Sequence, residues 1–170
     1  MRTVLSFDAR LEEHIPGLRR YAYALVRDRE RADDLVQDCL ARALSRRHLW
    51  RPGNLRAWLF RILHNVYVND VARAAIRPDA TALDAVTEPS IEASQDDVVY
   101  LRRVATRLAE LPADQREVLL LVGLEGFAYE EAARVLGVPV GTVMSRLSRG
   151  RRRLRELLAD TSTTTLRRVK

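Results

Sequence analysis

The 170-residue chain has few of the residues that build disulfides, metal sites and cofactor pockets. Cysteine occurs once, at Cys39, so no internal disulfide can form. The three histidines, His14, His48 and His64, are scattered along the chain and share no metal-ligand spacing with Cys39 or with one another. The acidic residues and histidines also form no pair or triad typical of a catalytic centre. We therefore expect no metal, no cofactor, no small-molecule substrate and no enzymatic activity.

Long hydrophobic runs are lacking as well. The apolar stretch before Asp8 is only a few residues long, far shorter than the core of a signal peptide. No other run approaches the length that spans a bilayer. The sequence thus predicts a cytoplasmic protein, kept reduced, that makes no membrane contact.

Lysine is nearly absent, because Lys170 is the only one and arginine supplies the rest of the 29 basic residues. The formal net charge is +6 and the isoelectric point about 10.2, which favours a polyanionic partner such as nucleic acid. Charge alone does not decide the matter, since solvated arginine-rich helix faces give the same composition. A nucleic-acid-binding motif is needed beside it.

Apolar residues recur at helical spacing through most of the chain, as in Leu18, Tyr21 and Leu25. The period is lost between residues 76 and 95, where acidic residues and prolines gather. We predict an all-α protein with two small helical domains. Its parts are a first domain over 1–75, a flexible acidic linker over 76–96, a second domain over 97–160 and a disordered tail over 161–170.

Residues 129–147 carry a helix-turn-helix pattern. An alanine-rich helix over 129–136 is followed by Gly137, which can adopt the left-handed conformation that ends a helix. The next helix, from 141 to about 158, has one apolar stripe and one polar, basic stripe. Side chains at the start of such a recognition helix reach base edges, and those further along reach phosphates. The predicted DNA contacts are Thr142, Ser145, Arg146, Arg149 and Arg153.

This part of the chain resembles region four of the extracytoplasmic-function (ECF) RNA polymerase sigma factors. The resemblance is carried by Leu111-Pro112, Gly126, Tyr129-Glu130-Glu131-Ala132-Ala133, Gly137-Val138-Pro139 and Ser145-Arg146-Leu147. It implies that the second domain reads the duplex minus-thirty-five promoter element in the major groove. Many members have arginine at the position of Met144, which leaves a base or phosphate contact there open.

The segment Asp34-Leu35-Val36-Gln37-Asp38 resembles the region-two helix of the same family, which holds the polymerase clamp. Carboxylates and an amide beside an apolar stripe suit docking onto a basic coiled coil. The resemblance implies a core RNA polymerase-binding role for Asp34, Gln37 and Asp38. Ordinary solvated surface charge is the alternative reading of the two aspartates.

Residues 55–73 resemble the part of region two that opens the promoter. Their apolar residues share one face, and Trp58 is expected to lie in the core with them. The resemblance implies that Asn65 lines a pocket for an unstacked base of the single-stranded minus-ten element. The full set of minus-ten contacts expected here is Arg56, Arg61, Asn65, Asn69 and Arg73.

Over residues 7 to 158 the resemblance implies an alternative sigma factor of the stress-response type, controlled by an anti-sigma factor. It would bind core RNA polymerase and start transcription at specific promoters. Two other functions stay open. A sigma mimic that sequesters an anti-sigma factor would not need the arginines near Asn65 or on the 141–158 helix. A conventional helix-turn-helix regulator would leave the first 75 residues unexplained.

Overall fold

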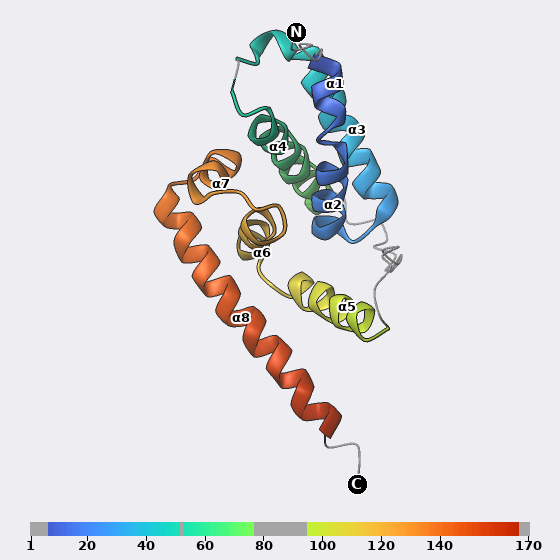
Figure 1. The fold of residues 1–170 in the computed structure, drawn as a ribbon, viewed down its shortest axis with the longest axis vertical. Coiled ribbons are helices and arrows are strands. Elements are labelled where there is room, and N and C mark those ends of the chain that lie inside the picture. The colour runs from blue at the N-terminus through green and yellow to red at the C-terminus, as the bar shows by residue number, and fades with distance from the viewer. Residues whose placement is uncertain (1–6, 52, 77–94, 167–170) are drawn as a thin grey trace, which may run out of the picture.

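The computed structural model describes residues 7–51, 53–76 and 95–166, and every regular element within them is helical (Figure 1). The all-α prediction is confirmed. Among these residues, no helix is both long enough and apolar enough to cross a membrane. The expected linker over 76–96 lies outside the described residues except at its two ends.

The first half packs four helices around one apolar core. Its elements are α1 (Phe7–Glu12), α2 (Ile15–Val26), α3 (Arg29–Ser45), the short 3₁₀ turn η1 (Arg47–Leu49) and α4 (Leu55–Ile76). Asp28 caps α3 by accepting a hydrogen bond from the Arg31 N–H at 2.9 Å. Burial raises the pKa of the Cys39 thiol to about 12, so this residue is a protonated part of the core.

The second half is built around the helix-turn-helix. Its elements are α5 (Gln95–Ala109), α6 (Ala113–Leu119), the π-helical turn η2 (Leu120–Leu124), α7 (Tyr129–Leu136) and α8 (Val140–Leu166). Gly137 takes a φ of 67° and ends α7, as its position predicted. A Cβ on Gly150 would come within 2.9 Å of Leu119 Cδ1. This glycine therefore sets how closely α8 packs on α6.

The helix α8 is longer than the sequence pattern indicated. It continues to Leu166, so the prediction of a disordered tail from residue 161 is wrong as far as residue 166. No glycine or proline interrupts the chain between Arg151 and Leu166. Backbone hydrogen bonding therefore propagates beyond the last apolar residue of the stripe. Residues 167–170 lie outside the described part.

The two halves pack against each other, which the sequence pattern did not predict. The helix α7 packs on α4, and η2 packs on α2. One buried cluster includes residues from both halves. Figure 1 shows α6 and α7 lying between the first half and the long α8. We call the contact between residues 7–76 and 95–166 the seam.

Candidate nucleic-acid interface and docking surface

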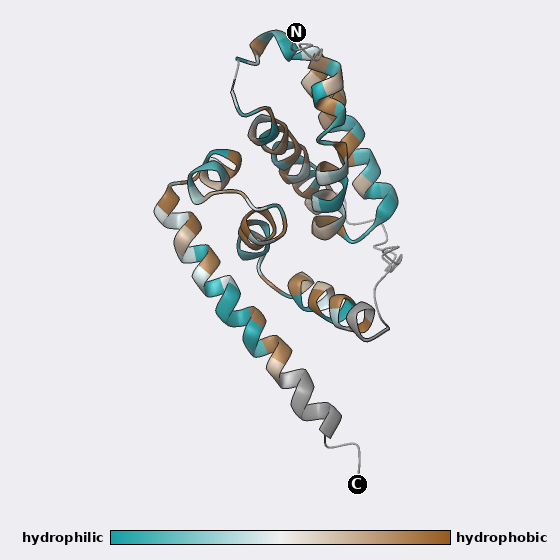
Figure 2. Ribbon diagram, in the orientation of Figure 1, coloured by the Kyte–Doolittle hydropathy of each residue, from teal (hydrophilic) through white to brown (hydrophobic). Residues whose placement is uncertain are grey.

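The beginning of α8 is held so that one side faces solvent. Val143, Leu147 and Gly150 are buried, because α6 and α7 pack on this side of the helix. Hydrophobic and hydrophilic residues alternate along its first turns, and a hydrophilic run follows in the middle (Figure 2). The predicted base-reading and phosphate-binding residues on this helix are the exposed Ser145, Arg149 and Arg153 and the half-buried Thr142 and Arg146.

The arginines of this surface have partners that solvent reaches, one on α8 itself and one on α6. The Arg149 Nε–H donates to the Ser145 carbonyl at 3.3 Å. Arg146 Nε lies 3.2 Å from Asp114 Oδ2, and that carboxylate is itself partly exposed. Exposed ion pairs of this kind contribute little and exchange readily, so phosphates can replace them. Met144, which directly precedes Ser145 on α8, has 53% of its surface exposed.

The helix α4 carries a polar stripe. Arg61, Asn65, Asn69 and Arg73 follow one another at four-residue steps, and all four are exposed. Residues at this spacing lie on nearly the same face of a helix. The structure thus brings four of the five expected minus-ten residues onto one surface. Trp58, expected in the core, is half-buried and packs against it.

Arg56 lies apart from this stripe. Arg61 follows it five positions later, so the two side chains point about 140° apart around the helix axis, and Arg56 points towards the seam. Its Nη2 is 2.9 Å from Glu125 Oε2, and it also donates to the Glu125 carbonyl. Its guanidinium carbon stands 4.2 Å from the centre of the Phe127 ring. The structure therefore places Arg56 within the seam.

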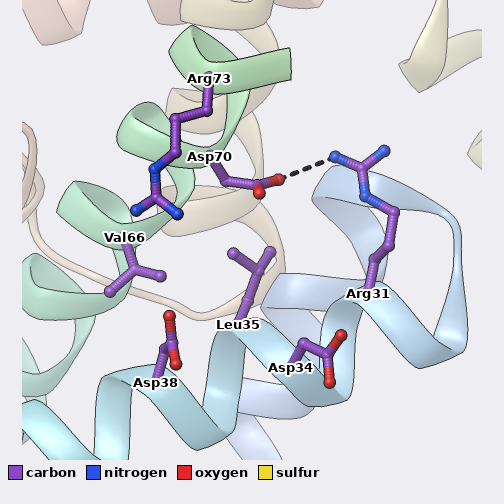
Figure 3. A pocket seen from close by; sticks show the side chains of 7 residues that line it. All are labelled: Arg31, Asp34, Leu35, Asp38, Val66, Asp70 and Arg73. Carbon is purple, nitrogen blue, oxygen red and sulfur yellow. Dashed lines mark hydrogen bonds and ion pairs between the residues drawn. The ribbon is translucent and has the colours of Figure 1, made fainter. Parts of the chain in front are cut away.

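The expected polymerase-binding residues lie beside a small recess between α3 and α4 (Figure 3). The recess has a volume of about 80 Å³ and buried apolar residues, Leu35 and Val66, in its lining. Asp34 and Asp38 are exposed at its rim, and Gln37 is exposed on the same helix. The remaining lining residues are Arg31, Asp70 and Arg73, of which Arg31 and Asp70 form a 2.8 Å ion pair.

Arg73 brings an expected DNA-binding residue into the recess beside the expected polymerase-binding residues. It was expected to bind the minus-ten strand, yet it lines the same recess as Asp34 and Asp38 (Figure 3). The structure thus joins the end of the α4 stripe to the recess beside Asp34 and Asp38.

Glu125 is the centre of the seam. Its side chain is 0% exposed, and Arg20 binds it at two points, with Nε 2.8 Å from Oε1 and Nη2 2.9 Å from Oε2. This hydrogen bonding raises the pKa of Arg20. A Cβ on Gly17 would meet Glu125 Oε2 at 3.2 Å, so the glycine permits the close approach of α2. Sequence reasoning missed Glu125, because Glu125-Gly126 has the composition of an ordinary surface turn.

Aromatic rings and a second carboxylate extend the seam. The Phe60 and Phe127 rings meet edge to face with centroids 5.0 Å apart. The side-chain amide of Asn54 donates to Glu131 Oε1. Glu131 Oε2 also accepts the Ala128 N–H at 3.1 Å, which ties the start of α7 to this contact. The seam therefore combines two carboxylates, two cations and an apolar centre.

Polar atoms in and beside the seam are incompletely satisfied. In the described part of the chain, the Tyr21 hydroxyl, His64 Nδ1 and Arg116 Nε are buried without a hydrogen-bond partner. His64 Nδ1 lies 2.9 Å from Glu117 Oε2 but without hydrogen-bond geometry. Leaving such a group unpaired costs about 1–3 kcal/mol. Each of these atoms that stays unpaired weakens the packing of the seam.

Comparison with known proteins gives a family match for each half of the chain. Residues 11–64 match the family model described as the Sigma2 domain of PhyR, and residues 101–154 match the model of Sigma-70, region 4. The chain is 41% identical over 147 residues to the ECF RNA polymerase sigma factor EcfG of Rhodopseudomonas palustris (strain TIE-1). This match covers 85% of the chain and 80% of that protein.

Solved structures resemble the whole arrangement. The sigma factor RpoE of Bartonella quintana, in complex with the anti-sigma factor NepR, is similar with a TM-score of 0.79 and 35% identity. That similarity covers 90% of this chain and 96% of RpoE. CnrH, in complex with the cytosolic domain of CnrY, is similar with a TM-score of 0.69 and 30% identity, over 91% of this chain and 88% of CnrH.

Proposed function

Because the chain belongs to the family of ECF RNA polymerase sigma factors, we propose that its surfaces divide the work of promoter recognition in a specific way. One surface docks core RNA polymerase, a second reads duplex DNA and a third binds the opened strand. The observation that supports this division is the exposure of polar surfaces on three helices, α3, α8 and α4, in one chain.

The α3 surface docks the polymerase. Asp34, Gln37 and Asp38 offer two carboxylates and an amide beside the apolar lining of the recess. A cationic helical partner would pair with the carboxylates while its apolar side chains cover Leu35. Arg73, at the same recess, is positioned between this partner and the DNA-binding stripe.

The α8 surface reads the minus-thirty-five duplex. A major groove about 12 Å wide admits one α-helix, whose first turns then face the base edges. Thr142, Ser145 and Arg146 lie in those turns and are assigned to bases. Arg149 and Arg153 follow one and two turns later and are assigned to phosphates.

The α4 stripe binds the single-stranded minus-ten element. Arg61 and Arg73 offer charge to the backbone, whereas the amides of Asn65 and Asn69 can both donate to and accept from a base edge. Such pairing returns the free energy needed to unstack a base. Arg56 joins this set only when the seam releases it.

An anti-sigma factor controls the chain in this proposal. RpoE, to which the chain is similar over nearly its whole length, was solved with the anti-sigma factor NepR. A partner of this kind would cover the polymerase-binding or DNA-binding surfaces. The place of action is the cytoplasm, where the polymerase and the promoter are found.

A sigma mimic is the second candidate function. The observation that favours it is that Arg56, one of the expected DNA contacts, is already bound by Glu125. The first half also matches the family model described as the Sigma2 domain of PhyR. A mimic would bind an anti-sigma factor and leave both DNA-binding surfaces unused.

In vitro transcription with purified core polymerase and a promoter library separates the two candidates. A sigma factor co-elutes with core polymerase and yields transcripts from a subset of promoters. Absence of association at micromolar concentration would refute the proposed function. Binding to an anti-sigma factor without binding to polymerase would establish the mimic instead.

A further inference from the structure

We propose that Asp114 of α6 determines how Arg146 reads the upstream duplex. Its carboxylate directs the Arg146 guanidinium towards a base edge and keeps it from settling on a phosphate. Asp114 acts through Arg146 and is therefore a positioning residue. The inference rests on the proposed function, because it concerns the same α8 surface, and it adds a residue from another helix to that surface.

The ion pair between the two residues leaves part of Arg146 free. Asp114 Oδ2 approaches the guanidinium at Nε, 3.2 Å away. With the described residues, Arg146 makes no other hydrogen bond or ion pair. Its two terminal nitrogens, Nη1 and Nη2, are thus available to a ligand. Two parallel N–H groups of an arginine match the O6 and N7 acceptors of guanine, so a G·C pair is the expected target.

The backbone of α6 holds Asp114 at this place. The next residue, Gln115, lies against α8, and a Cβ on Gly150 would come within 3.4 Å of the Gln115 carbonyl oxygen. Gly150 follows Arg146 by four residues, so both lie on the side of α8 that meets α6. An incoming anion can displace the solvent-reached ion pair. The carboxylate nevertheless stays nearby, because the close backbone contact anchors α6 on α8.

Burial separates Arg146 from the other arginines assigned to DNA on this helix. Only 26% of its side chain is exposed. Arg149 and Arg153 are exposed, and neither pairs with a carboxylate of the described residues. A side chain with little free surface loses few conformations on binding, which suits a contact of defined geometry. Arg146 is therefore suited to a base edge, and Arg149 and Arg153 are suited to phosphates.

The Asp114 charge also selects between the two kinds of DNA acceptor. Together Asp114 and Arg146 have no net charge, so the pair gains little from the phosphate backbone. A phosphate bound to Arg146 would come close to the carboxylate, and like charges repel. A guanine edge carries no net charge and avoids most of this repulsion. Asp114 is thus a repulsive element against the wrong contact, which lowers total affinity and raises discrimination.

The first test is Asp114→Asn, which keeps the shape and an oxygen acceptor but removes the charge. The full chain is titrated with the duplex that wild type selects from a randomised pool, and with duplexes changed at single base pairs. Discrimination should fall about fivefold or more at one G·C pair. Unrelated duplex should bind about two- to fivefold tighter at low salt, with a salt slope steeper by about one unit, because Arg146 is then free to bind phosphate. A uniform loss of affinity with an unchanged slope would show a structural role only and would overturn the proposal.

The second test asks whether Asp114 acts through Arg146. Asp114→Asn is repeated in an Arg146→Ala chain, where it should change neither discrimination nor the salt slope. Glu130→Gln, an equal loss of charge at an exposed position of α7, is the control and should leave discrimination unchanged. Equal effects of Asp114→Asn with and without Arg146 would mean that the carboxylate acts on DNA directly, and the proposal would be wrong.

Failure of this inference and failure of the proposed function give different results. If wild type and Asp114→Asn select the same duplexes with equal discrimination, the positioning role is refuted and α8 remains a duplex reader. If wild type selects no duplex and does not associate with core polymerase, the proposed function is refuted, and the inference with it.

Discussion

The helices α4 and α8 both carry arginines that we assign to nucleic acid, but these arginines have different partners. On α8 the partners are reached by solvent, as in the contact of Arg146 with Asp114 of α6. On α4 Arg56 is bound across the seam by a carboxylate that solvent does not reach. Exposed pairs exchange easily, whereas a buried pair is released only by separating the surfaces that bury it. Duplex reading should therefore be available in the free chain, whereas the contribution of Arg56 to strand binding should not.

The largest effect should come from reversing charge at Asp34 and Asp38, which lie on neither DNA-binding helix. Asp34→Lys with Asp38→Lys should lower affinity for core polymerase by on the order of a hundredfold, because like charges would then face a cationic partner. Co-elution and titration of labelled core measure it. Glu12→Lys with Glu13→Lys, also exposed in the first half, is the control and should change little. Unaltered affinity in the first variant would make Asp34 and Asp38 solvated charges.

Asn65→Ala should give the next largest effect and act on α4 alone. Loss of an amide that pairs with one base edge costs roughly 1–3 kcal/mol, or about tenfold to a hundredfold in occupancy of the open promoter. Permanganate footprinting measures that occupancy, while polymerase association and duplex binding should stay nearly intact.

A promoter premelted across the minus-ten element sharpens the Asn65 prediction. Wild type and variant should both gain on this template, but the variant should keep a weaker preference at one non-template base. Normal opening together with normal base preference would make Asn65 a structural residue of the α4 surface.

Arg149→Ala should have a smaller effect, confined to α8. Loss of one phosphate contact should lower duplex affinity by less than about tenfold and reduce the slope of log affinity against log salt by about one unit. Arg29→Ala, exposed on α3, should leave the slope unchanged. An unaltered slope in the Arg149 variant would exclude a phosphate contact.

Ser145→Ala and Arg146→Ala distinguish base reading from phosphate binding on the same helix. If these side chains contact bases, each change should alter which upstream sequences are preferred, by about 1–3 kcal/mol at one position. A selection from randomised duplexes measures it. A uniform loss over all sequences would assign both residues to phosphates.

The smallest effect concerns the packing that supports α8. Gly150→Ala should be less stable than Gly141→Ala by about 1–3 kcal/mol, because only the first methyl group meets Leu119 and Gln115. Alanine gains more helix propensity at Gly150, in the interior of α8, than at Gly141 in the first turn, so a lower stability of Gly150→Ala must come from the packing. Chemical denaturation measures it, and equal stabilities would mean that α8 shifts to accommodate the methyl group.

The features that could be predicted from the sequence are those that depend on local patterns of residues. The helices follow from apolar periodicity, and the end of α7 follows from Gly137. The last turns of α8 were missed because no apolar stripe marks them, and a continuous backbone sufficed to extend the helix. The assignments of individual residues to polymerase and DNA stay predictions.

The seam could not be predicted from the sequence, and the reason is physical. Glu125 lies 69 residues from Arg56 and 105 from Arg20 in the chain. Its role depends on how two separately predicted domains meet, and no spacing within either domain encodes that. The environment of Arg56 has this origin, whereas that of Arg73 depends on how α3 packs on α4 within the first half.

The closed seam also limits how much of a promoter the free chain can span. The minus-ten and minus-thirty-five elements lie about 25 base pairs apart, or about 85 Å along B-form DNA at roughly 3.4 Å per base pair. A compact chain of this length has a radius of gyration of about 15 Å, so its diameter is about half that distance. The closed protein is therefore too short to bridge the two elements. Simultaneous binding of both elements would therefore require the two halves to separate from the closed arrangement.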